Sequence, residues 1–76
     1  MVESQIEAAF TDHLFEPADH VTAHRIALNL EKRLGQPLFV SYMENNTSKV
    51  STFKVRLRER EYIVNVYGTT ISYGEL

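Results

Sequence analysis

The chain has 76 residues, and its eight Lys and Arg against ten Asp and Glu give a formal net charge of -2 at pH 7. This length holds one compact domain, since separate domains rarely have fewer than about 50 residues. The charge balance argues against a general nucleic-acid coat or a polybasic membrane anchor. The absence of cysteine excludes disulfides, thiol nucleophiles and thiolate zinc sites. We therefore expect a single small domain over residues 1–76.

The first residues predict no targeting or membrane segment. Glu3 and Glu7 lie where a signal peptide would carry basic residues followed by an apolar stretch. No run approaches the roughly 18 apolar residues of a membrane span. We therefore expect a cytoplasmic protein that does not insert into a membrane.

Two helices are predicted in the first half of the chain. Ser4-Gln5-Ile6-Glu7 has the pattern of a capping box, which predicts that the first helix begins at Ser4. Glu16-Pro17 ends this segment, because proline removes a backbone donor and disfavours helix in the residue before it. The apolar stripe of the helix recurs at spacings of three and four residues and comprises Ile6, Ala9, Phe10, His13 and Leu14.

The second helix is predicted over residues 18–34. Asp19 can cap its first turn, Lys32 and Arg33 suit its last turn, and Gly35 ends it. Its apolar stripe comprises Ala23, Ile26, Ala27, Leu30 and Leu34.

From Leu38 onward the apolar pattern has a period of two, which is typical of strands. A two-residue hairpin at Gly68-Thr69 sets Val66 opposite Ile71. We therefore expect an α+β fold in which two N-terminal helices pack on a four-stranded antiparallel meander, in the order ααββββ.

The other two connections fix the expected register of the remaining strands. A turn at Glu59-Arg60, or a four-residue turn over Arg58–Glu61, sets Leu57 opposite Tyr62 and Val55 opposite Val64. The polar loop Glu44–Lys49 then brings Val40 opposite Phe53.

Alternate residues of a strand point to opposite faces of the sheet, so the strands predict two faces of different composition. The face expected under the helices comprises Leu38, Val40, Tyr42, Phe53, Val55, Leu57, Val64, Val66 and Ile71. The opposite face mixes apolar and cationic side chains, namely Phe39, Met43, Val50, Ile63 and Tyr67 with Lys54, Arg56 and Arg58. An uncovered apolar patch of several hundred Å² is typical of proteins that have a partner. Two alternatives stay open: one helix covers each face of the sheet, or the face is simply more apolar than average.

One run of basic residues stands out at strand spacing, from Lys54 through Arg56 and Arg58 to Arg60. Beside Tyr67 and Phe39, such a stripe could contact phosphates and stack bases of a single-stranded nucleic acid. The alternative is a solvated strand in which Arg58 pairs with Glu61 across the turn.

Signals for chemistry are weak. Glu16, His20 and His24 have the helical spacing of a divalent-metal site, but the sequence marks no fourth ligand. There is no nucleophile elbow and no glycine-rich phosphate loop, and a domain of this size has little volume for a substrate pocket. We expect no enzyme activity, no catalytic residue, no metal and no cofactor.

The sequence thus favours a non-catalytic protein-binding module, acting as an adaptor, a small subunit or a stoichiometric inhibitor. Its partner would be another protein or a second copy of the chain. Single-stranded nucleic acid, bound by Lys54–Arg58, is the alternative. The partner-binding residues that we expect are Phe39, Met43, Lys54, Arg56, Arg58, Ile63 and Tyr67.

Overall fold

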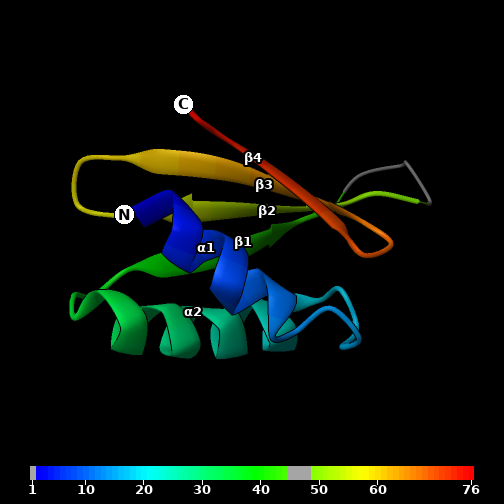
Figure 1. The fold of residues 1–76 in the computed structure, drawn as a ribbon, viewed down its shortest axis with the longest axis horizontal. Helices are drawn as coiled ribbons and strands as arrows, with labels where there is room; N and C mark the ends of the chain where they lie inside the picture. The colour runs from blue at the N-terminus through cyan, green and yellow to red at the C-terminus, as the bar shows by residue number, and fades with distance from the viewer. Residues whose placement is uncertain (1, 45–48) are drawn as a thin grey trace.

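The computed structural model contains two helices followed by a four-stranded antiparallel sheet, and it describes residues 2–44 and 49–76 (Figure 1). Consecutive strands are neighbours, in the order β1-β2-β3-β4. The predicted α+β fold and its ααββββ order are therefore confirmed. Most of the expected loop Glu44–Lys49 lies outside the described residues. The elements are α1 (Val2–Thr11), α2 (His20–Leu34), β1 (Phe39–Met43), β2 (Ser51–Arg56), β3 (Glu61–Tyr67) and β4 (Thr70–Glu75).

The helix α1 begins at Val2, two residues before the predicted start, so the interpretation of Ser4 as its cap is wrong. Val2 packs against the core, which gives the helix a reason to extend past Ser4, and Glu3 in the first turn suits the helix dipole. After Thr11 the chain continues in turns, with backbone bonds from His13 to Phe10 and from Glu16 to His13.

The helix α2 begins at His20, two residues later than predicted, and ends where predicted. Asp19 has extended backbone angles, and its side chain accepts a hydrogen bond of 2.9 Å from the Thr22 backbone N–H, which confirms it as the N-cap. At the other end Gly35 has φ of 70°, and its N–H donates to the Glu31 carbonyl at 2.8 Å. Glycine ends the helix here because it adopts the left-handed conformation without strain.

The strand pairing keeps the predicted faces but not the whole predicted register. The hairpin between β3 and β4 is confirmed, with Val66 opposite Ile71. In the other two pairs the register is displaced by two residues: Val55 lies opposite Tyr62, and Val40 lies opposite Val55. Side chains alternate between the two faces with a period of two residues, so a shift of two residues leaves every residue on its predicted face. The physical cause at the β2–β3 connection is a four-residue loop one position earlier than expected, closed by a hydrogen bond from Leu57 N–H to the Arg60 carbonyl.

Both helices cover the same face of the sheet. The Phe10 ring of α1 meets Phe53 edge-on with centroids 5.3 Å apart, and the His20 ring of α2 meets Tyr42 at 5.9 Å. Tyr42 and Phe53 are cross-strand partners on one face. The alternative with one helix on each face is therefore wrong. The buried core comprises Ile6, Ala9, Phe10, Ala23, Ile26, Ala27, Leu30, Leu38, Phe53, Val55, Leu57, Tyr62 and Val64.

Candidate functional site: the open face of the sheet

The face of the sheet turned away from the helices, called here the open face, carries large side chains that residues 2–44 and 49–76 leave exposed. Phe39 is 73% exposed, Tyr67 54% and Met43 40%. Ile63 and Lys54 are half-buried by their neighbours on the strands, and Arg56 is exposed. A sheet face that only met water would carry mostly small polar and charged residues. Six of the seven predicted partner-binding residues thus lie on β1, β2 and β3, and Arg58 lies two residues after the end of β2.

The register orders these residues into rows across the strands. Phe39, Arg56 and Glu61 form one row, and Ser41, Lys54 and Ile63 form the next. A third row joins Met43 to Thr52, Asn65 and Ser72, with a hydrogen bond of 2.9 Å from the Thr52 hydroxyl to the Asn65 side-chain oxygen. Tyr67 lies in the row beyond, opposite Thr70.

This order separates Phe39 from Tyr67, so the two rings do not both lie beside the basic stripe as predicted. Three rows correspond to about 20 Å along the strands, at roughly 3.3 Å per residue. The polar row of Thr52 and Asn65 lies between them. Val50 is half-buried just outside β2 and adds little exposed surface. The apolar groups of the open face are therefore spread out, and Phe39 marks its basic end.

The surface around Phe39 contains two shallow hollows. One shallow hollow is lined by Phe39, Ser41, Lys54 and Arg56. A second is lined by Pro37, Leu38, Phe39, Arg56, Leu57 and Arg58. Phe39 and Arg56 line both hollows, so an aromatic ring and a guanidinium are shared by two neighbouring depressions.

The charges on this face are arranged differently from the expected stripe. Lys54 Nζ lies 2.8 Å from Glu61 Oε2. This hydrogen bond, together with the positive charges of Lys54 and Arg56, holds the pKa of Glu61 below its usual value of 4.5, against the opposing effect of burial. The expected pairing of Arg58 with Glu61 is therefore wrong. Arg60 contacts Glu75 at 3.6 Å and the Tyr62 hydroxyl at 3.5 Å. Within residues 2–44 and 49–76, Arg56 and Arg58 are the members of the run that form no ion pair.

A polar joint between the helices was not predicted. Arg33 of α2 donates to Asp12 Oδ2 at 2.8 Å and to the Asn29 side-chain oxygen at 3.0 Å, while Asn29 also donates to Asp12 at 3.2 Å. These bonds, with Asn29 first and Arg33 second, hold the pKa of Asp12 below its usual 3.8. Nothing in the spacing of these residues along the chain marks the joint, because it depends on the angle between the helices.

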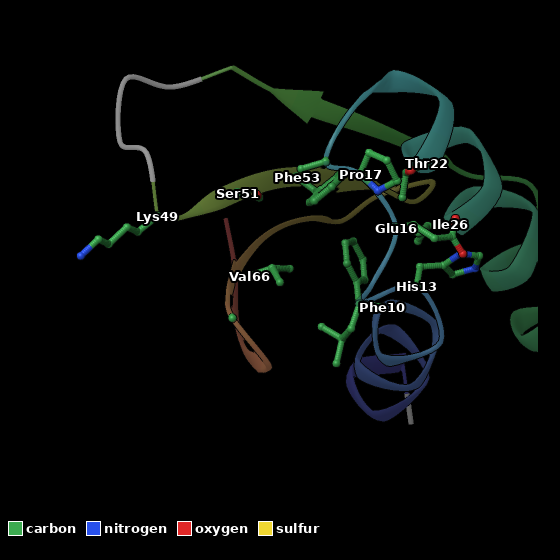
Figure 2. A pocket seen from close by; sticks show the side chains of 13 residues that line it. Phe10, His13, Glu16, Pro17, Thr22, Ile26, Lys49, Ser51, Phe53 and Val66 are labelled. Atoms are coloured by element: carbon green, nitrogen blue, oxygen red, sulfur yellow. The ribbon is translucent and has the colours of Figure 1, made fainter.

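A cavity of about 140 Å³ lies beside this joint, among the end of α1, the start of α2 and the ends of β2 and β3 (Figure 2). Its walls mix apolar and polar side chains, and in Figure 2 the Lys49 side chain points away from it. The His13 ring bonds Glu16 Oε2 at 2.6 Å, and the buried Glu16 Oε1 lies 3.3 Å from Arg25 Nη1. Small-molecule sites usually measure about 300–1,000 Å³, so we assign no ligand to this cavity.

The structure does not bring the three hypothetical metal ligands together. Glu16 faces His13 and Arg25, whereas the His20 ring packs against Tyr42. His24 lines a hollow between α2 and β1. The described part of the chain contains no group of three His, Cys, Asp or Glu side chains placed to hold a metal ion.

Comparisons of this chain with family models, with curated proteins and with solved structures found no match. Within the described ranges, neither helix has the length and apolar character needed to cross a membrane. Function must therefore be argued from the open face itself.

Proposed function

We propose that the protein is a non-catalytic protein-binding module whose open face docks on another protein. The observation that carries this proposal is the exposure of Phe39 at 73% on a sheet face that both helices leave uncovered. An adaptor, a small subunit and a stoichiometric inhibitor would all use such a surface in the same way.

The residue types of this face support a protein partner. Aromatic residues, Met and Arg are enriched at the centres of protein interfaces, where they fill pockets and exclude water. Phe39 supplies an aromatic anchor, and the two hollows beside it offer room for side chains of the partner.

The charges around Phe39 suggest the chemistry of that partner. Arg56 and Arg58 line the same hollow as Phe39, and neither forms an ion pair with a carboxylate among the described residues, although Arg56 lies opposite Glu61. Guanidinium groups bind carboxylates in a bidentate manner. The partner would therefore present an apolar side chain flanked by Asp or Glu.

Single-stranded nucleic acid remains the second candidate, but the geometry favours it less. Lys54 is paired with Glu61, and Tyr67 lies at the opposite end of the face from Arg56 and Arg58. Binding of bases requires aromatic and cationic groups close together along one path.

A photo-crosslinking experiment tests the proposal. A photoreactive phenylalanine analogue replaces Phe39 in the full chain, and the same analogue replaces Phe15 as a control, because Phe15 is 92% exposed on the turn between the helices. We expect a nuclease-resistant adduct with one defined protein from position 39 only, and its loss on adding Arg56→Glu while the thermal unfolding midpoint is unchanged.

Three results would contradict the proposal. Adducts of equal yield from positions 39 and 15 would show non-specific contact. Adducts that disappear after nuclease treatment would favour the hypothesis that the partner is a nucleic acid. An adduct of only twice the 8.8 kDa chain mass would show that position 39 meets a second copy and no other protein.

A further inference from the structure

The His13 ring lies beside the polar joint and contacts one partner with each of its two nitrogens. Nδ1 lies 2.6 Å from Glu16 Oε2, and Nε2 lies 3.3 Å from the side-chain nitrogen of Asn29. The His13 side chain is only 12% exposed, so water has little access to the ring. These two partners therefore determine which ring nitrogen carries a proton.

The orientation of the Asn29 amide is fixed by its other contacts. Arg33 Nε donates to the Asn29 oxygen at 3.0 Å, and a guanidinium has only donors, so the amide oxygen must face Arg33. The amide nitrogen then faces both Asp12 Oδ2, at 3.2 Å, and His13 Nε2. Its two hydrogens match these two acceptors, provided that Nε2 carries no proton of its own.

The donors and acceptors of this network match for a single form of the ring. A carboxylate only accepts, so Nδ1 must carry the proton that is donated to Glu16, and Nε2 must be free to accept from Asn29. This form is the neutral ring protonated on Nδ1, which is the less common form of an imidazole in water. A second proton, on Nε2, would point at the hydrogens of the Asn29 amide.

We propose that His13 is a proton-operated switch of the polar joint. The neutral ring holds the Asn29 amide against Asp12 and Arg33, and protonation of Nε2 turns the amide over and releases it from both. Histidine suits this role because it is the side chain that most readily changes charge near neutral pH.

The turned amide changes the bonds between the helices. Its oxygen accepts from the new Nε2–H, whereas its nitrogen now faces the donor Arg33 Nε and its oxygen faces the Asp12 carboxylate. Asn29 therefore loses its bonds to Asp12 and Arg33, and the joint keeps the ion pair of Arg33 with Asp12 at 2.8 Å. The segment that follows α1 is then held to α2 by fewer bonds at acidic pH.

The surrounding charges leave both states of the ring open. The groups that face the ring from its own turn and from α2 have both signs, namely Asp12, Glu16, Arg25, Lys32 and Arg33. Lys49, at the far side of the cavity, points away from the ring (Figure 2). The matching of donors and acceptors, rather than one neighbouring charge, therefore distinguishes the two states.

The first test identifies the form of the neutral ring. In nitrogen-15 NMR spectra of the full chain, recorded where the ring is neutral, we expect the proton of His13 on Nδ1. His24 is exposed on α2 and serves as the reference in the same spectra, where it should favour Nε2. A neutral His13 ring with its proton on Nε2 would overturn the proposal.

The second test follows the Asn29 amide through the titration of the ring. The side-chain amide resonances of Asn29 and the Nε resonance of Arg33 should change with the same midpoint as the His13 ring. Asn65 is the internal control, because its side chain is bonded to Thr52 on the open face and should not change at that midpoint. An Asn29 amide that keeps its resonances throughout would contradict the switch.

Two substitutions then remove or reverse the opposing N–H. Asn29→Ala should move the His13 midpoint to higher pH, and Asn29→Asp, which places an acceptor of the same size beside Nε2, should move it further. Asn29→Ala should also raise the pKa of Asp12 toward 3.8, because the bond from Asn29 is the largest cause of its lowered value. Asn65→Ala is the matched control and should leave both titrations unchanged.

Two further outcomes would overturn the inference. Equal effects of Asn29→Ala and Asn65→Ala on the His13 midpoint would show a general response to substitution instead of a local one. A ring that stays neutral until the chain unfolds would show that the joint has no second state within the fold.

Discussion

Lys54 of β2 and Glu61 of β3 lie diagonally across the two strands, and their Nζ and Oε2 atoms are 2.8 Å apart on the open face. The pair neutralises Lys54, the first residue of the basic run, so the positive charge of this face that forms no ion pair among the described residues is concentrated at Arg56 and Arg58. The residues that can attract an acidic partner are therefore Arg56 and Arg58, whereas the paired Lys54 only contributes to the shape of the surface.

Replacement of Lys54 by Met should raise the pKa of Glu61 toward its usual 4.5, because the hydrogen bond and the positive charge that lower it are both removed. In the native chain, this pair contributes stability above pH 4.5, and the contribution is lost as the pH falls through the lowered pKa of Glu61. The measurement is an NMR titration of the side-chain carboxyl carbons. Asp12 is the internal control, since its lowered pKa depends on Asn29 and Arg33 and should not move. An unchanged Glu61 pKa would contradict the ion pair.

Phe10→Ala should lower the free energy of unfolding by about 3–5 kcal/mol, because it removes a buried ring that packs edge-on against Phe53. A domain of 76 residues has a total stability of roughly 4–11 kcal/mol. Thermal unfolding should therefore show a midpoint lower by more than about 12 °C, or no cooperative transition. Phe15→Ala is the matched control and should change the free energy by less than about 0.5 kcal/mol. Similar losses for both variants would contradict this core.

Gly35→Ala should lower the free energy of unfolding by about 1 kcal/mol, because φ of 70° is strained for a residue with a Cβ. The added Cβ would meet no atom within 4 Å, so strain is the whole effect. Gly74→Ala serves for comparison, since Gly74 has no positive φ and equally open space. Chemical denaturation of both variants checks the difference, and an equal loss would argue against the left-handed cap.

Addition of equimolar zinc should leave the thermal unfolding midpoint unchanged, because Glu16 is bound to His13 and Arg25 and does not face His20 or His24. A ligand that binds only the folded state raises the midpoint, and the rise grows with the logarithm of the ligand concentration once this exceeds the Kd. A rise that His20→Ala with His24→Ala abolishes would contradict this geometry and restore the metal hypothesis.

The fold could be predicted because each element carries a local signal. The apolar residues recur with a period of about 3.6 in the helices and of 2 in the strands, and both patterns are local. The signals that end or connect elements also act within a few residues, namely the Asp19 cap, Gly35 and the Gly68-Thr69 turn. The predicted register was wrong at the β2–β3 connection because Glu59-Arg60 has no strong turn preference. The apolar pattern could not correct it, since a shift of two residues leaves the same side chains on each face.

The candidate site was predicted in composition but not in arrangement. The alternation of side chains along the strands was enough to place Phe39, Met43, Ile63 and Tyr67 on one face. The distance between Phe39 and Tyr67 depends on the register, and the choice of Lys54 over Arg58 as the partner of Glu61 depends on a diagonal contact between strands. The polar joint of Asp12, Asn29 and Arg33 depends on helix packing, which no spacing along the chain encodes.

Every strand of the sheet pairs only with its neighbour in the sequence, whereas α1 packs against β4 at the other end of the chain. The meander can therefore assemble by successive closure of short loops, which is a fast route. The first helix has no complete surface to settle on until the last strand is in place. During synthesis on a ribosome, α1 can pack against α2 early, whereas its contact with β4 forms only after the whole sheet has been translated, so this contact is a late step of folding.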